Sequence, residues 1–233
     1  MKEIVYFLTD LFIATFGKCN NLRGKYVFIW IPKNAGTSIY ASLRKNGMIK
    51  YKRLIAIKYL LKANASLTFG HISLDSLFEG GLVKERDVSD SHFFAVLRDP
   101  YERFSSIYNY YQSTGAFRRY HLSPSVSEVL DMLEKGHYPK VGLYHHVTFS
   151  MFNPQSSWIP KDRKVTFFRQ DKLQEDINRY FSDLGENVTI RIDRLNSNVV
   201  EIDLSQDERK RIKALYRIDF ELIESVNQGD IST

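Results

Sequence analysis

The sequence predicts an α/β fold whose central, mainly parallel sheet is flanked by helices. Three short apolar runs, at 26–31, 92–97 and 164–168, have the composition of strands that are buried on both faces. Each run precedes a stretch with helical periodicity, and strands that alternate with helices are typical of a parallel sheet. No linker or internal repeat divides the chain. We therefore expect a single domain over 1–233, with residues 1–24 as a helical extension at its N-terminus.

Local sequence signals set the boundaries of these elements. The first strand ends at Pro32, and the helix after it ends near Gly47. Near the C-terminus, Ser205 and Glu208 have the spacing of a capping box, which opens a charged helix toward Tyr216. Further elements are expected as helices over 37–45, 54–61, 101–111, 126–134 and 172–181, and as a short strand over 66–69.

Composition narrows the class of protein and its partners. A chain of 233 residues with 43% hydrophobic residues can bury a sizeable core. Its net charge of +6 favours anionic partners, such as nucleotides, acidic polysaccharides, nucleic acid or an anionic membrane surface. Cys19 is the single cysteine, which excludes an internal disulfide. The apolar run from Ile4 to Phe16 is too short to span a bilayer. We expect a cytoplasmic protein, with a membrane-peripheral position of the N-terminal helix as the alternative.

The stretch IPKNAGTS, residues 31–38, has the features of an anion-binding loop. A strand that turns directly into a helix leaves free N–H groups at the helix N-terminus, where the helix dipole also favours negative charge. Gly36 would let the backbone approach an anion closely, and Lys33 adds a full positive charge. Thr37 and Ser38 offer hydroxyl groups. The simpler alternative is an ordinary strand–turn–helix with a surface lysine.

A second candidate anion site follows the second strand. Arg98 stands at the end of that strand, where α/β sheets bind ligands, and Ser106 lies two turns into the next expected helix. The two side chains could clamp one phosphate, because the planar guanidinium matches phosphate oxygens. A local ion pair between Arg98 and Asp99, with a solvated Ser106, is the alternative.

The two motifs together resemble those of the sulfotransferases that use 3′-phosphoadenosine 5′-phosphosulfate (PAPS). IPKNAGTSI is similar to the loop that holds the 5′-phosphosulfate, and RDPYERFSSIY to the segment that holds the 3′-phosphate, in the same order. The resemblance is closest to the carbohydrate branch that includes heparan sulfate 2-O-sulfotransferase and its bacterial relatives. Three later segments are also similar to this family: HHVTFSMFNPQSSWI, LNSN and LYRIDFELI. The chain departs from the family after the third expected strand, where relatives often have a glutamate and this sequence has Arg169 and Gln170. Any role that the glutamate has in relatives is therefore in doubt for this chain.

The resemblance implies the sulfotransferase fold, with a P-loop-like sheet, and PAPS as the cofactor, converted to 3′-phosphoadenosine 5′-phosphate (PAP). It implies no requirement for a metal. Lys33 would act at the oxygen that bridges phosphate and sulfate. Relatives place a catalytic histidine in a similar Gly-His segment, so His71 is the expected general base. The expected nucleotide ligands are Lys33, Asn34, Ala35, Gly36, Thr37, Ser38, Arg98, Ser106, Asn196 and Ser197, and the expected acceptor ligands are Arg103, Tyr110, His145, His146 and Gln155.

The expected function is in-line transfer of a sulfuryl group to a hydroxyl acceptor. The first candidate for the acceptor is a carbohydrate, which can carry acidic groups. Aromatic and basic residues interleave over 108–121, which suits acidic sugars, although the tyrosines could equally be core residues. The first alternative is a kinase-like phosphotransferase that uses ATP. The sequence argues against it, because the Gly-Lys-Ser/Thr ending of a triphosphate loop is missing. A basic nucleic-acid-binding protein is the second, and it leaves the two ordered motifs unexplained. The acceptor, the sulfated position and the oligomeric state are left open.

Overall fold

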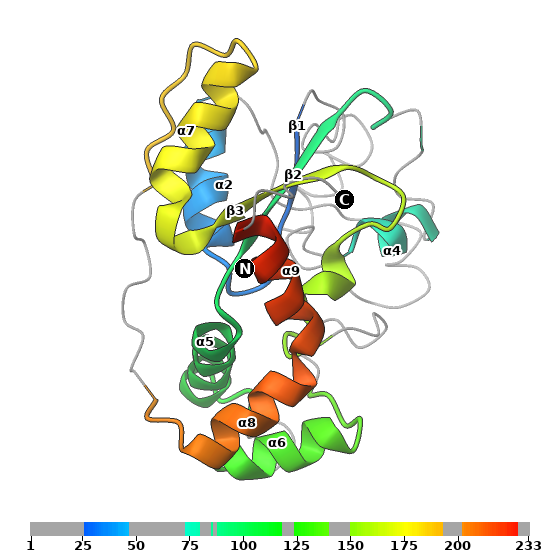
Figure 1. Ribbon diagram of the computed structural model, residues 1–233, viewed down its shortest axis with the longest axis vertical. Helices are drawn as coiled ribbons and strands as arrows, with labels where there is room; N and C mark the ends of the chain where they lie inside the picture. The colour runs from blue at the N-terminus through cyan, green and yellow to red at the C-terminus, as the bar shows by residue number, and fades with distance from the viewer. Residues whose placement is uncertain are drawn as a thin grey trace, which may run out of the picture.

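The computed structural model describes residues 26–46, 73–79, 85, 88–117, 124–139, 150–192 and 202–227 (Figure 1). Three expected elements lie outside the described residues: the N-terminal helical extension over 1–24, the helix over 54–61 and the strand over 66–69.

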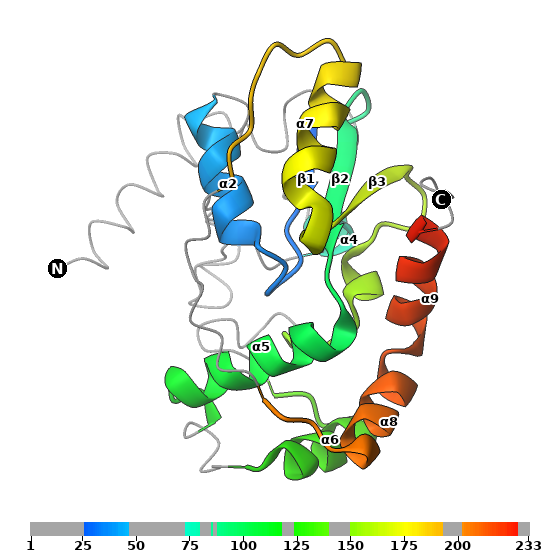
Figure 2. The same cartoon turned by 60° about the vertical axis from the view of Figure 1, so that its left-hand side comes forward.

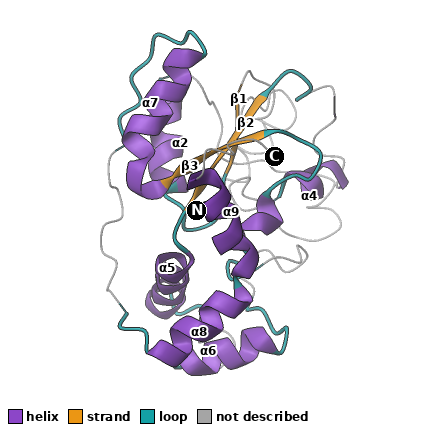
Figure 3. Cartoon of the chain, viewed as in Figure 1, coloured by secondary structure: helices purple, strands orange, loops and turns teal. Residues whose placement is uncertain are grey.

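Three parallel strands form the described sheet, which confirms the predicted α/β class (Figure 3). Strand β1 (Tyr26–Ile29) pairs with β2 (His92–Leu97), and β2 pairs with β3 (Val165–Arg169) in the order β1-β2-β3. In this register Phe28 lies opposite Phe94, and Ala95 opposite Phe167. The carboxyl ends of all three strands therefore meet at one edge of the sheet.

Helices cover both faces of this sheet (Figures 1 and 2). Helices α2 (Gly36–Lys45) and α7 (Leu173–Asp183) pack on one face, against side chains such as Phe28 and Phe94. Helices α4 (Leu74–Glu79) and α9 (Arg217–Asn227) cover the other face, with the short 3₁₀ helix η4 (Gln155–Trp158). Successive strand residues point to opposite faces, and both faces are buried, so the strands read as continuous apolar runs.

A third helical layer lies beyond the carboxyl edge of the sheet (Figure 1). It contains α5 (Pro100–Ser113), α6 (Val126–Glu134) and α8 (Gln206–Leu215), which share their own apolar core. At the surface, Arg211 of α8 donates to Asp131 at 2.5 Å and to Glu134 at 2.7 Å, both on α6. The carboxyl edge of the sheet, where α/β proteins bind ligands, therefore faces the layer formed by α5, α6 and α8.

Local chemistry accounts for where most elements begin. Helix α5 begins at Pro100, one residue before the expected start, because the carboxylate of Asp99 accepts from the amides of Tyr101 and Glu102. The predicted capping box of Ser205 and Glu208 is confirmed. Helix α6 has the predicted bounds and carries a second capping box that the sequence reading missed. That reading also missed α4, η4 and α9.

In the described part of the chain no helix is both long and apolar enough to cross a membrane.

Candidate functional site

The candidate site is centred on the loop between β1 and α2, residues 30–35, which we call the β1–α2 loop. It lies at the carboxyl edge of the sheet, next to the end of β2 and the start of α5 (Figure 2). Arg98, the first residue after β2, donates from Nη1 to the backbone oxygen of Lys33 at 3.2 Å. The two stretches that the sequence singled out as anion sites are therefore in direct contact.

Three amides of the β1–α2 segment have no acceptor among the described residues. They are those of Lys33, Ala35 and Gly36, whereas the amide of Asn34 donates to the backbone oxygen of Ile31 at 3.4 Å. Lys33 and Ala35 have φ angles of 68° and 56°, in the left-handed region, while Asn34 between them is not in that region. Left-handed residues in such turns can direct neighbouring N–H groups toward an anion. Left-handed φ at a non-glycine residue costs free energy, and such strain is commonly stored at functional sites.

Gly36 is required by the packing of Trp30. An ideal Cβ built on Gly36 would lie 1.8 Å from Nε1 of Trp30 and 2.1 Å from its Cδ1. The indole is buried and stacks on the ring of Tyr40, at a centroid distance of 5.3 Å. The sequence reading assigned this glycine to close approach of an anion. The structure adds a second reason, which is that the indole occupies the space of a side chain at the first residue of α2.

Two cations come together at the site. The ammonium of Lys33 lies 4.7 Å from the centroid of the Tyr110 ring, on α5, a distance at which the ring attracts the charge. Burial lowers the pKa of Lys33 below its ordinary value of 10.5, and the charge of Arg98 lowers it further. Arg98 is nearly buried, and its Nε donates to Glu102 at 3.2 Å. Its Nη2 donates to no acceptor among the described residues, so one edge of the guanidinium is available to a ligand.

Buried amide side chains hold the loop from below. Nδ2 of Asn34 donates to the backbone oxygen of Val96 at 2.7 Å and to Oε1 of Gln155 at 2.5 Å. Oδ1 of Asn34 is buried and has no partner among the described residues. Gln155 in turn accepts from the amide of Arg98 at 3.0 Å and donates to its carbonyl at 2.8 Å. The loop and the end of β2 are thereby joined through one side chain.

A buried arginine forms a second support. Arg103, which is 1% exposed, donates to the backbone oxygens of Pro32, Met151 and Asn153 at 2.8 to 3.2 Å. Its guanidinium also lies 5.5 Å from the centroid of the Trp158 ring. Burial lowers the pKa of the Arg103 guanidinium, while neighbouring Tyr216 and Asp219 act to raise it.

Asp219, at the start of α9, completes this support. Its carboxylate accepts from the amides of Gln155 at 2.7 Å and Ser156 at 3.0 Å, which fixes the first turn of η4. Burial raises the pKa of the Asp219 carboxyl, while those two hydrogen bonds and the charge of Arg103 act to lower it. The sequence reading missed this residue as part of the site, although it lies in the LYRIDFELI segment that resembles the sulfotransferases.

Arg103 and Gln155 are two of the residues that the sequence predicts as acceptor ligands. Both side chains are almost completely buried, and their polar atoms are engaged by the protein itself. They lie beneath the loop and position it. Tyr110, by contrast, lies beside Lys33.

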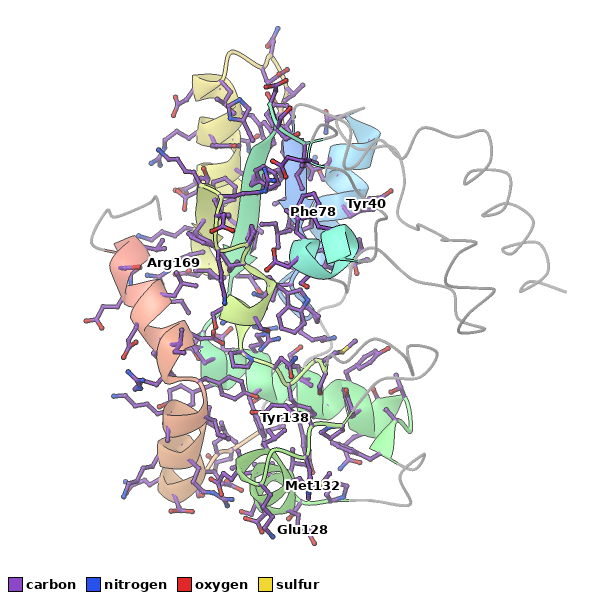
Figure 4. The ribbon with its side chains drawn as sticks, turned by 90° about the vertical axis from the view of Figure 1, so that its right-hand side faces the viewer. Tyr40, Phe78, Glu128, Met132, Tyr138 and Arg169 are labelled. Carbon is purple, nitrogen blue, oxygen red and sulfur yellow. The ribbon has the colours of Figure 1, made fainter. Side chains whose placement is uncertain are left out.

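The remaining predicted residues divide into three groups. In the first turn of α2, Thr37 is exposed and Ser38 is half-buried. Ser106 lies on the buried face of α5, and its predicted clamp with Arg98 stays a prediction. Arg169, at the end of β3, lies beside α9 (Figure 4). It binds Asp171 at 2.6 Å and Oδ1 of Asn227 on α9 at 2.5 Å. It thus ties a strand to a helix at the position where sulfotransferases often have a glutamate. Five predicted residues lie outside the described part of the chain: His71, His145, His146, Asn196 and Ser197.

Comparison with known proteins places the chain at a distance from characterised families. No family model matches it, and no curated protein matches it. Among solved structures, a sulfotransferase from Alicyclobacillus acidocaldarius is similar, with a TM-score of 0.44 and 14% sequence identity over 88% of this chain and 95% of that chain. Likeness at this level assigns neither a family nor an activity, so both have to be inferred from the residues of this chain.

Proposed function

We propose that the chain is a PAPS-dependent sulfotransferase that transfers a sulfuryl group to a hydroxyl of a carbohydrate. The observation that carries the proposal is the convergence of Lys33 and Arg98 at the carboxyl edge of a parallel sheet, beside a loop in which three amides have no acceptor among the described residues. The two cations disfavour each other in the free protein, because the charge of Arg98 lowers the pKa of Lys33. A ligand with more than one phosphate would relieve that repulsion. The resemblance of both motifs to the sulfotransferases supports the choice of PAPS.

The described residues fit such a nucleotide. The unpaired amides of the β1–α2 loop and the ammonium of Lys33 would hold the 5′-phosphosulfate. The open edge of the Arg98 guanidinium would hold the 3′-phosphate, with Ser106 as its expected partner. PAPS supplies an activated sulfuryl group whose leaving group is a phosphate. The contribution of Lys33 is charge: an ammonium held in a partly dry site stabilises negative charge that develops on the leaving oxygen.

The acceptor hydroxyl has to lose its proton as the new bond to sulfur forms and the bond from sulfur to the phosphate oxygen breaks. We propose His71 as the general base that takes this proton, and His145 and His146 as acceptor ligands, on the basis of the sequence alone. Tyr110 would line the acceptor side, because its ring already contacts Lys33. An aromatic face beside cations suits a sugar with acidic groups. The proposed reaction requires no metal. We also propose a cytoplasmic location for the enzyme.

Binding and transfer test the proposal separately. Calorimetry should show that PAP binds the protein without added magnesium, and radiolabelled PAPS should label at least one member of a panel of neutral and acidic glycans. Absence of PAP binding would overturn the proposal. Magnesium-dependent binding and turnover of ATP in place of PAP would instead favour the kinase-like alternative.

Lys33→Met is expected to weaken PAP binding about 10- to 100-fold, the loss of one charge-assisted contact. The ligand-free variant should be at least as stable as the natural protein, because burial and Arg98 both act against the charge of Lys33. Calorimetry and thermal unfolding measure the two effects. Lys45→Met, at the exposed end of α2, is the matched control and should change neither. Equal affinity of the Lys33 and Lys45 variants for PAP would remove Lys33 from the site.

Affinity for PAP should fall as the pH rises through the lowered pKa of Lys33, at a lower pH than an ordinary lysine would require. The sign follows from proton linkage, because the charged ammonium binds the anion and a bound anion raises its pKa again. Calorimetry between pH 7 and pH 10 would measure the change. The Lys33→Met variant should lack this decline, and the same decline in both proteins would assign it to another group.

A further inference from the structure

Gln155 occupies an unusual place for a side chain amide. It lies in η4, far in sequence from both anion motifs, and is 0% exposed. Its amide makes the two hydrogen bonds to the backbone of Arg98, one accepted and one donated, that a neighbouring strand would make. The residue that carries the second anion-binding cation is therefore held at its backbone by Gln155, just past the point where β2 ends.

The same amide also holds the first anion-binding segment. Oε1 of Gln155 accepts from Nδ2 of Asn34 as well as from the amide of Arg98. Asn34 stands between the two left-handed residues of the β1–α2 loop, so its side chain anchors the strained part of the loop. One oxygen atom thus joins the loop and the Arg98 segment. These lie far apart in sequence, since Asn34 and Val96, near the end of β2, are 62 residues apart.

Gln155 is itself fixed from a third direction. Its backbone amide and that of Ser156 donate to the carboxylate of Asp219. Arg103 of α5 binds the carbonyls of Pro32, in the β1–α2 loop, and of Asn153, two residues before Gln155. The side chains of Gln155, Asp219 and Arg103 are buried, and a buried polar group that loses its partner costs free energy. The position of the amide is therefore determined by the packing of α9 and α5 around it.

We propose that Gln155 is a positioning residue that sets the distance between the two phosphate-binding elements, the β1–α2 loop and Arg98. The inference rests on the proposed function, because it requires a ligand with two phosphates. Such a ligand gains affinity over a single-phosphate ligand only if both elements are held at the matching spacing, since the second contact is then intramolecular. Loss of the joint would remove that gain and would leave each separate contact in place.

The test compares three probes by calorimetry: PAP, adenosine 5′-monophosphate and adenosine 3′-monophosphate. We expect the natural protein to bind PAP about 100-fold more tightly than either monophosphate, by the effective concentration of a second linked contact. In Gln155→Met, which keeps the approximate side-chain volume and removes the three side-chain hydrogen bonds, that advantage should fall about tenfold or more. Affinity for each monophosphate should change less than about threefold. Gln206→Met, on the exposed first turn of α8, should keep the full advantage.

Each outcome decides something. If the folded Gln155 variant keeps the advantage of PAP, the inference fails while the proposed function stands. If all three affinities fall together, Gln155 supports the structure without setting the spacing, and the inference again fails. Absence of PAP binding by the natural protein would overturn the proposed function itself. Should Gln155→Met not fold in thermal unfolding, Asn34→Ala replaces it, because that variant removes the loop's half of the joint and leaves the pairing of Gln155 with Arg98 intact.

Discussion

Replacement of Asp219 by alanine is expected to lower the free energy of unfolding by about 2–5 kcal/mol, the cost of leaving one buried and one partly buried N–H group without an acceptor. Those groups are the amides of Gln155 and Ser156, which the carboxylate accepts at 2.7 and 3.0 Å. The buried charge of Arg103 would also lose the neighbouring group that favours it. Urea unfolding at neutral pH measures the loss, and a decrease of this size is a large part of the stability of an ordinary domain.

Glu221 offers a matched control on the same helix. It is exposed and pairs with Arg217 one turn away, at 2.7 Å, so Glu221→Ala should cost less than about 1 kcal/mol. Asp219→Asn should fall between the two variants, because an amide keeps one acceptor oxygen. If Asp219→Ala cost no more than Glu221→Ala, η4 would not depend on α9 for its position.

Gly36→Ala is expected to destabilise the protein by about 1–3 kcal/mol, as in other overpacked cores, and to weaken PAP binding more than tenfold. The new Cβ would lie within 2.5 Å of three atoms of the Trp30 indole. The indole has little room to move, because the Tyr40 ring stacks on it and the centroid of the Phe28 ring lies 6.1 Å from its own. The clash would therefore shift the first turn of α2 and, with it, the adjoining loop that is proposed to bind the 5′-phosphosulfate. Thermal unfolding and calorimetry with PAP measure the two effects.

A second substitution separates the clash from other causes. Trp30→Leu should remove the obstructing ring, so the double variant should bind PAP more tightly than Gly36→Ala alone, a coupling expected of residues in contact. Gly185→Ala is the control for glycine replacement, since it introduces strain at a φ of 76° but meets no atom within 4 Å. It should cost about 1 kcal/mol in stability and leave PAP affinity unchanged. Equal PAP affinity in Gly36→Ala and Gly185→Ala would contradict the packing account.

Elements whose signals are local could be predicted from the sequence. Strand β2 has the expected bounds, because an apolar run is followed by Asp99, which caps the next helix, and by Pro100, which begins it. The capping box of Ser205 and Glu208 involves residues three apart and was equally readable. The same holds for β1, the turn after it and α2, since strand, turn and helix are consecutive in the chain.

The sequence by itself thus determined the α/β class, the approximate elements and the two cations, Lys33 and Arg98, as candidate anion ligands. Only the tertiary structure decided what holds them. Arg103, which the sequence predicts as an acceptor ligand, is buried and donates to the backbone oxygens of Pro32 and Asn153. The contacts of Gln155 with Asn34 and Asp219 span 121 and 64 residues. Contacts of that range depend on how whole helices pack, and no local pattern of residues encodes them.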